Sequence, residues 1–249
     1  RALGNRPPAG RRRGRRAPPS ATAGRWSLVA PLLANPPTPT ERLHARTLLY
    51  LERHGIVSRE AMALENQVGG FGAIYPVLRE MEETGRIRRG HFVEGMTSAQ
   101  LAVPGAVDRL RSLRARPGKP QAVLLATTDP AQPYGTQLPW PDSRRAASKP
   151  RRAAGCYVVL VDGVPSVFVD KGGERVLCFE DETEEAGAAR LVQALRCVAR
   201  NVERIGRKRL SIETIDGERA RVSALAGFFV KAGFRSGYRG LEIDRFDPR

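Results

Sequence analysis

The stretch SREAMALENQVGGFGAIYPVLREMEETGRIRRGHFVE, residues 58–94, decides the expected fold of the first half of the chain. It holds a capped helical segment, a cluster of glycines that breaks it, a second helical segment and a short basic run that favours β-structure. A helix over residues 40–54 precedes it, and its packing face carries Leu43, Thr47, Tyr50 and Leu51. Three helices followed by a basic hairpin are typical of a winged helix-turn-helix. We therefore predict a winged-helix domain over residues 25–116.

The boundaries of the second and third helices follow from caps and breakers. Ser58 caps the second helix, whose packing face is predicted to carry Ala61, Leu64 and Val68. Proline is tolerated in a helix mainly in the first turn, so Pro76 places the start of the third helix near Ala73 or Ile74. Gly85 is expected to end that helix.

The basic run after the third helix is the expected wing, with two short strands around Gly90. We predict that it contacts DNA through Arg86, Arg88, Arg89 and His91. The outward face of the third helix carries Glu80, Glu82 and Glu83, which phosphates would repel. The alternative is that the winged helix packs only against other domains.

Residues 117–249 are expected to form a second domain of mixed α+β structure. Asp162-Gly163 predicts a tight hairpin between strands over residues 156–161 and 164–169. Further strands are expected over residues 121–127, 175–179, 210–215 and 241–244, and a last helix on Val222, Leu225, Ala226 and Phe229. The strongest helical pattern runs from about Glu184 to Ile205. A small β-barrel-like sheet covered by two helices is the economical arrangement.

That long helix also carries a ridge of arginines opposite its apolar face, formed by Arg196, Arg200 and Arg204. Two interpretations remain open: the ridge is a solvated face, or it follows a phosphate backbone.

Charge points to a polyanionic partner. The 249 residues contain 42 Lys and Arg against 26 Asp and Glu, a formal net charge of +16. Residues 1–24 are expected to be a basic flexible arm, because they combine arginine, proline and glycine and contain no acid. Residues 142–152 form a second basic loop. Such segments attract nucleic acid by releasing counterions, although a solvated linker would have the same composition.

Several classes of site are not expected. The sequence has no apolar run of 18 residues, so no membrane partner is predicted. The three cysteines form no CxxC pair, so we expect no metal site and a reducing, cytoplasmic location. No GxxxxGK[ST] phosphate loop occurs, so no cofactor is expected in this chain. Because the chain starts at Arg1 without an initiator methionine, we expect it to be part of a longer protein.

Four motifs carry a family resemblance. They are Gly24-Arg-Trp-Ser-Leu-Val29, Gly69-Gly-Phe-Gly-Ala-Ile-Tyr-Pro-Val-Leu-Arg79, Gly90-His-Phe-Val-Glu-Gly95 with Gln100-Leu-Ala-Val-Pro104, and Asp129-Pro-Ala-Gln-Pro-Tyr-Gly135 with Leu138-Pro-Trp-Pro141. In this order they resemble the C-terminal end of the Lhr ("large helicase-related") proteins, superfamily-2 ATP-dependent 3′-to-5′ DNA helicases. The resemblance covers about residues 24–245. It implies a last winged helix plus a β-barrel. It also implies that ATP and magnesium belong to a motor outside this chain.

The resemblance leads to two hypotheses of different classes. In the first, the chain is an accessory DNA-binding and assembly module of an Lhr-type helicase acting in DNA repair, with the upstream helicase domains as partners and homo-oligomerisation left open. Tyr134 and Trp140 are then candidates for stacking on unpaired bases, or else they plug the mouth of the barrel.

In the second hypothesis the chain is a DNA glycosylase, since the Lhr C-terminal region resembles the AlkZ-type DNA glycosylases. Gln67 stands alone where those enzymes carry a Gln-x-Gln pair. A glycosylase needs a carboxylate that activates water and offsets an oxocarbenium-like charge. The candidates are Asp129 and Asp244, whose ordinary interpretations are a turn cap and an exposed charge. Whether this chain is itself an enzyme stays open.

Overall fold

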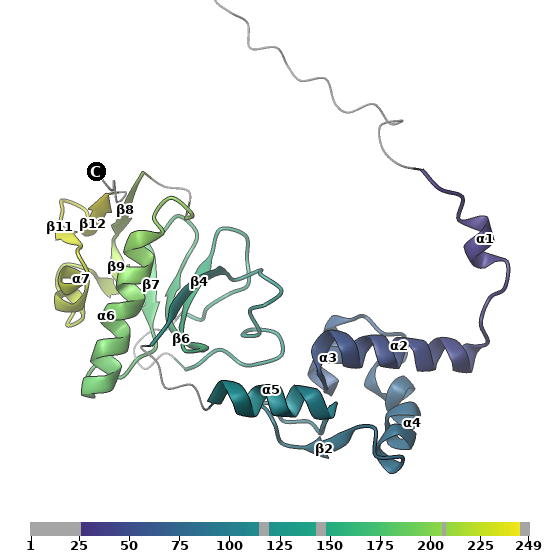
Figure 1. Ribbon diagram of the computed structural model, residues 1–249. Helices are drawn as coiled ribbons and strands as arrows, with labels where there is room; N and C mark the ends of the chain where they lie inside the picture. Colours follow the sequence, from purple (N-terminus) through teal and green to yellow (C-terminus); the bar gives the residue numbers. More distant parts are fainter. Residues whose placement is uncertain (1–25, 115–119, 143–147, 206–207, 245–249) are drawn as a thin grey trace, which may run out of the picture. The chain divides into compact units, whose positions relative to one another are not determined.

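The computed structural model describes residues 26–114, 120–142, 148–205 and 208–244 (Figure 1). The predicted basic arm, residues 1–24, lies outside the described residues. Residues 143–147, which are part of the second basic loop (residues 142–152), also lie outside them. The chain forms two compact units, and the boundary between them falls between Arg42 and Leu43. The first part contains α1 (Ala30–Leu33) and the start of α2 (Pro39–His54).

A capping box sets the start of α2. The Thr38 backbone N–H donates to Glu41 Oε2 (2.8 Å), and the Glu41 N–H donates to Thr38 Oγ1 (3.3 Å). This reciprocal pair satisfies two backbone donors that have no partner inside the helix. The helix therefore begins at Pro39, where a missing N–H costs nothing.

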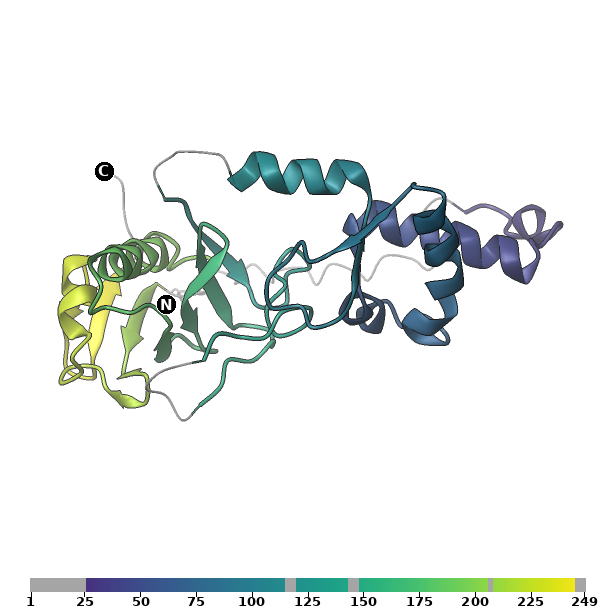
Figure 2. The ribbon, with the colours of Figure 1, turned by 90° about the horizontal axis from the view of Figure 1, so that it is seen from below.

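The winged helix is present. Its helices are α2, α3 (Arg59–Leu64) and α4 (Gly70–Glu83), followed by α5 (Pro104–Arg114). Its strands form an antiparallel sheet in the order β1 (Ile56–Val57), β3 (Gln100–Ala102), β2 (Arg88–Gly90). Figure 2 shows α2, α3 and α4 grouped around this sheet. Its buried apolar core consists of Tyr50, Leu51, Val57, Ala61, Met62, Ile74, Leu78, Met81, Ile87 and Leu101.

Two helix predictions need correction. The third helix, α4, begins at Gly70, so Pro76 is its seventh residue and lies inside the helix. The first turn is stabilised by packing, because Phe71 contacts Tyr75 with ring centroids 5.7 Å apart. In α3 the buried residues are Ala61 and Met62. The other two residues predicted for its packing face, Leu64 and Val68, are exposed.

The wing also differs from the prediction. Strand β2 pairs with Gln100–Ala102 and not with the residues directly after Gly90, so residues 91–99 form the loop. Gln100 is fully buried and holds this loop. Its Oε1 accepts from the N–H groups of Phe92 (2.9 Å) and Val93 (2.8 Å), and its Nε2 donates to the Val93 carbonyl (2.9 Å). A buried amide that satisfies three loop groups explains the position of the return strand.

The second half of the chain is built on a six-stranded sheet in the order β10-β9-β7-β6-β5-β4. All pairs are antiparallel except β7–β9. The predicted hairpin at Asp162-Gly163 is confirmed, since both residues have positive φ as a type I′ turn requires. The strands are β4 (Ala122–Ala126), β5 (Tyr157–Val161), β6 (Val164–Val169), β7 (Arg175–Cys178), β9 (Thr214–Ile215) and β10 (Glu218–Arg219).

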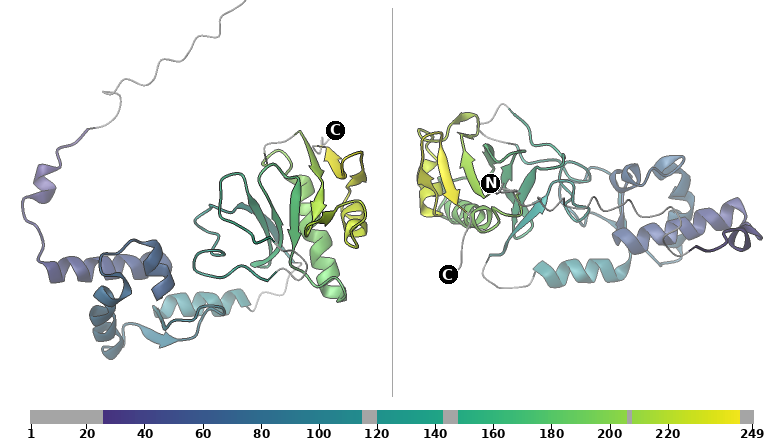
Figure 3. Two further views of the ribbon diagram at one scale, coloured as in Figure 1. Left: turned by 180° about the vertical axis from the view of Figure 1, so that it is seen from behind. Right: turned by 90° about the horizontal axis from the view of Figure 1, so that it is seen from above.

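A second sheet has the order β11-β12-β8, formed by β11 (Arg235–Ser236), β12 (Leu241–Asp244) and β8 (Arg209–Ile212). Helix α6 (Glu185–Arg200) packs across β4, β5 and β6, and α7 (Ala226–Lys231) lies beside it (Figure 3). The expected mixed α+β class and the two covering helices are both observed. Within the described ranges the sheets are open, so the second domain is barrel-like only in a loose sense.

Two further boundaries differ from the sequence pattern. The strand expected over residues 210–215 divides at Glu213, where the chain passes from β8 in one sheet to β9 in the other. The N–H groups of Glu213 and Thr214 both donate to the carbonyl of Glu174, which marks the crossing. The last helix begins at Ala226, and Val222 lies before it with 79% of its surface exposed.

A charged network stabilises the turn between β6 and β7. Asp170 is buried, and it accepts hydrogen bonds from Arg151 Nη2 (2.9 Å), the Lys171 N–H (2.8 Å), Cys156 Sγ (3.3 Å) and Arg175. Burial alone would raise the pKa of Asp170, but these donors outweigh it and lower the pKa to about 2. All three cysteines of the chain fall among the described residues, are buried and form no disulfide.

We predict that Asp170→Asn destabilises the second domain by about 1–3 kcal/mol, because it removes a charge that four donors stabilise. Since the folded pKa lies below the unfolded value, this contribution is present above about pH 4 and is lost as the pH falls toward 2. Urea unfolding at pH 7 and at pH 3 measures both effects. Glu174→Gln, an exposed neighbour, is the control. Equal stability of the wild type and Asp170→Asn at pH 7 would contradict the assignment.

Candidate nucleic-acid interface

A cavity of about 710 Å³ lies beside the C-terminal half of α6. Helix α6 supplies one wall, and the β8, β11 and β12 strands with the residues before β11 supply the other. Its lining comprises Arg196, Ala199, Arg200, Arg209, Ala232, Gly233, Arg235, Ser236, Gly237, Glu242, Ile243 and Asp244. We call this cavity the arginine cleft.

Positive charge dominates the arginine cleft, because its lining holds four arginines and two acids. Arg209 is neutralised locally, since its Nε lies 2.6 Å from Asp244 Oδ1 and its Nη1 lies 3.6 Å from Glu242 Oε2. Among the described residues Arg200 and Arg235 form no ion pair. Within the same described part of the chain, Arg196 donates a hydrogen bond to the backbone carbonyl of Lys231 (3.5 Å) and forms no ion pair. Three of the four guanidinium groups are therefore available to an anion.

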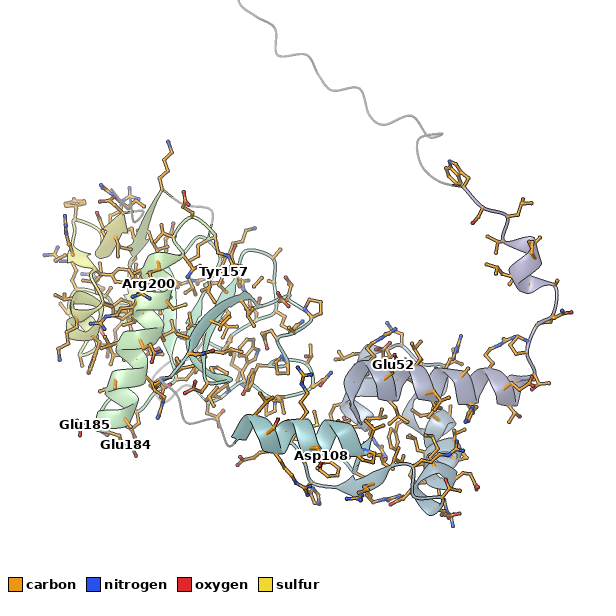
Figure 4. All side chains as sticks on the ribbon, viewed as in Figure 1. Glu52, Asp108, Tyr157, Glu184, Glu185 and Arg200 are labelled. Carbon is orange, nitrogen blue, oxygen red and sulfur yellow. The ribbon has the colours of Figure 1, made fainter. Side chains whose placement is uncertain are left out.

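The packing of α6 directs two of these arginines into the cleft. Leu191, Leu195, Val198 and Ala199 are buried in the core with the six-stranded sheet. Arg196 and Arg200, which directly follow Leu195 and Ala199, lie off that face. The acidic residue of α6 lies at its other end: Figure 4 shows Glu185 there beside the N-cap residue Glu184, and Arg200 toward the C-terminus. The cleft end of the helix is thus free of carboxylates from α6 itself.

The third residue of the predicted ridge, Arg204, lies beyond the end of α6. Its side chain is exposed and does not line the cleft, and its backbone carbonyl accepts a hydrogen bond from the Tyr157 hydroxyl (2.7 Å). Two of the three arginines of the predicted ridge, Arg196 and Arg200, therefore line one cavity.

The two candidate carboxylates are in different surroundings. Asp244 lines the arginine cleft and is exposed, with Arg209 as its partner. Asp129 Oδ1 accepts from the Ala131 N–H (2.9 Å), which closes a turn of the chain before β5. The capping interpretation thus describes the geometry of Asp129, whereas Asp244 stands beside a cavity and unpaired cations.

Tyr134 and Trp140 form a partly buried pair, with ring centroids 6.2 Å apart and ring planes inclined by 27°. Trp140 also packs edge-on against the buried Phe168, and the Tyr134 hydroxyl donates to the carbonyl of Gly163 (3.0 Å). Burial raises the pKa of Tyr134. Both rings thus already pack against protein groups, which favours the plugging interpretation of the pair.

The wing residues differ in their availability. Arg86, Arg88 and His91 are exposed. Arg89 lies 2.7 Å from Glu82 Oε2 through Nη2, which also donates to the Tyr75 hydroxyl (3.1 Å). These hydrogen bonds raise the pKa of Arg89 beyond its already high value. His91 and Phe92 also line a cavity of about 340 Å³ with residues of α5.

Sequence reasoning found Asp244 of β12 but missed the arginines that β8 and β11 contribute to the cleft. Arg209 and Arg235 come from strands far apart in the sequence, so no local pattern linked them to α6. A usable signal was the run Arg235-Ser-Gly-Tyr-Arg-Gly240, which combines arginines, glycines and an aromatic residue in a turn. Within the described ranges, no group of three or more histidine, cysteine, aspartate or glutamate side chains is arranged to hold a metal ion.

Comparison with known proteins identifies the winged helix. Residues 36–122 match the family model of the large helicase-related protein winged-helix domain. The chain is thus similar to the Lhr family over these residues. No helix among its described residues is long and apolar enough to cross a membrane.

Two curated Lhr relatives extend the match to most of the chain. The "Lhr helicase/probable uracil glycosylase" of Mycolicibacterium smegmatis is 41% identical over 231 residues, which cover 89% of this chain and 15% of the relative. The "Lhr helicase/uracil glycosylase" of Escherichia coli is 36% identical over 223 residues, which cover 88% of this chain and 14% of the relative. The chain thus spans about one seventh of the length of these Lhr proteins.

The wing geometry leads to a prediction about neighbouring arginines. Arg88→Ala should weaken duplex binding about two- to five-fold, whereas Arg89→Ala should change it less, because Glu82 already offsets the charge of Arg89. Fluorescence anisotropy with a labelled duplex at low salt compares the two single variants. A larger loss for Arg89→Ala would show that its ion pair opens to contact DNA.

Proposed function

We propose that this chain is a DNA-binding module of an Lhr-type helicase and that the arginine cleft is its main phosphate-binding surface. The observation that supports this proposal is that Arg196, Arg200 and Arg235 line one cavity and form no ion pair among the described residues. Guanidinium groups bind phosphate oxygens in paired geometry, and several on one surface bind a backbone independently of sequence.

The arrangement of charges supports a polyanion rather than a small acidic ligand. The cleft is open, and its cations come from both walls, α6 on one side and β11 on the other. The exposed Arg86 and Arg88 supply a second basic surface on the winged helix. Two basic surfaces on one chain suit an extended backbone that contacts several cations.

The proposal assigns binding, not ATP hydrolysis, to this chain. The sequence contains no phosphate loop, and this chain matches only 15% and 14% of the curated relatives that carry the word helicase in their names. Helicase domains of the same protein are the proposed partners, and ATP and magnesium are proposed to act there. A role in DNA repair is part of this proposal and follows from the base-excision candidate below.

The cleft predicts a change in salt dependence. The Arg200→Ala/Arg235→Ala variant should bind DNA about ten-fold more weakly, and the slope of log K against log salt should become shallower by about 0.7–0.9 for each phosphate that the variant no longer neutralises. Filter binding over a salt series measures the slope. The matched control is Arg219→Ala/Arg221→Ala, which removes the same charge from exposed positions outside the cleft lining. Equal slopes for the two double variants would refute the cleft as the binding surface.

A second candidate function is excision of a damaged base. The observation that favours it is the position of Asp244, a carboxylate that lines the cleft beside three available guanidinium groups. Phosphates bound by those groups would bring a sugar near the carboxylate, and a glycosylase uses a carboxylate to activate water and stabilise a cationic sugar. Uracil glycosylase is the activity in the names of both Lhr relatives, and we propose uracil in DNA as the substrate to test.

Asp244→Asn should abolish formation of alkali-labile abasic sites in uracil-containing DNA while DNA binding persists, because the amide keeps the shape and loses the charge. Asp129→Asn is the comparison, since its side chain closes a turn and its loss should leave cleavage intact. Gel electrophoresis after alkali treatment measures the strand breaks at abasic sites, and fluorescence anisotropy measures DNA binding. Full activity of Asp244→Asn would remove it as the catalytic carboxylate, and loss in Asp129→Asn alone would move the assignment to Asp129.

A further inference from the structure

The turn between β11 and β12 presents a tyrosine and an arginine at its tip. Ser236 pairs with Leu241, and the Gly237 N–H donates to the carbonyl of Gly240 (2.8 Å), so Tyr238 and Arg239 are the two residues at the end of the hairpin. The same hairpin contributes Arg235 to the arginine cleft.

Two glycines fix the direction of this tip. A Cβ atom at Gly240 would clash with the backbone carbonyl of Ile212 in β8, and one at Gly237 would clash with the side chain of Glu242. At Gly240 the hairpin therefore lies against the backbone of β8 more closely than a residue with a Cβ atom allows. Its tip is held at a defined place beside the cleft.

Tyr238 is 94% exposed, the highest value among the exposed large hydrophobic residues described. Its ring packs in neither of the two main apolar cores. By contrast, Phe229 of α7 and Phe234, just before β11, pack edge to face in the core with ring centroids 5.4 Å apart. Folding thus gains little from an aromatic ring at this position. Both faces of the ring are accessible, whereas Tyr134 and Trp140 already contact other groups.

We propose that the Tyr238 tip stacks on an unpaired base of a DNA strand whose phosphates lie in the arginine cleft. This inference rests on the function proposed above and adds a preference for single-stranded or unstacked nucleotides. Arg235 lines the cleft and Arg239 shares the tip, so an exposed arginine stands on each side of Tyr238 in the sequence. A tyrosine ring reaches the face of a base only where the neighbouring base has left it, which duplex DNA does not offer.

The proposal predicts a difference between two probes. Tyr238→Ala should weaken binding of the full chain to a labelled dT20 strand about ten-fold, and binding to a 20-base-pair duplex less than about two-fold. Tyr238→Phe and Tyr238→Trp should restore single-strand binding, because stacking needs a ring and not a hydroxyl. The salt slope should stay unchanged, because the ring carries no charge. Val222→Ala, another exposed apolar residue of this domain that does not line the cleft, is the matched control.

The outcomes separate the inference from the function on which it rests. If the wild type binds in a salt-dependent way and Tyr238→Ala leaves single-strand binding unchanged, the stacking proposal fails and the phosphate cleft stands. Equal loss for both probes also overturns it, because a duplex offers no free base face. If the wild type binds neither probe at low salt, the proposed DNA-binding function and the stacking proposal fall together.

Discussion

The arrangement of the second domain depends on burying one face of α6 against the six-stranded sheet. Leu191, Leu195 and Val198 occupy that face, and the 3.6-residue period then leaves Arg196 and Arg200 on a flank that no strand covers. The second sheet lies beside this flank. Its strand β8 is the next strand after α6 in the chain, β12 pairs with β8, and β11 pairs with β12. The arginine cleft is therefore a consequence of core packing, and no separate feature is needed to form it.

Elements with a local signal could be predicted from the sequence, and elements specified by distant contacts could not. Asp162-Gly163 encodes its own turn, and the long apolar stripe of α6 encodes its own helix. The predicted start of α4 is three or four residues too late. Phe71 and Tyr75 pack in the first turns of the helix, and this packing outweighs the expected cost of Pro76 inside a helix. The wing was misplaced for a similar reason: its return strand is held by the buried amide of Gln100.

The same distinction explains the candidate site. Arg196 and Arg200 follow from helical spacing, and Asp244 was recognised as a carboxylate at the end of the last strand. Arg209 and Arg235 join them only through strand pairing, which sequence distance conceals. The aromatic candidates needed the structure for a choice between two interpretations. Tyr134 and Trp140 stand in a loop rich in proline and glycine, and the sequence left both base stacking and plugging open. That loop folds back over Phe168 and partly buries both rings.

Electrostatics links the binding function to the catalytic alternative. A carboxylate close to bound phosphates is repelled by them, so Asp244 and Glu242 would weaken a DNA site if they stood alone. Arg209 lies between them and offsets this charge, with its guanidinium 2.6 Å from one and 3.6 Å from the other. Arg200 and Arg235 then remain available for the backbone. The contact with Arg209 also holds the Asp244 side chain in position at the cleft. The composition of the cleft is thus compatible with both proposals, phosphate binding and base excision, on the same surface.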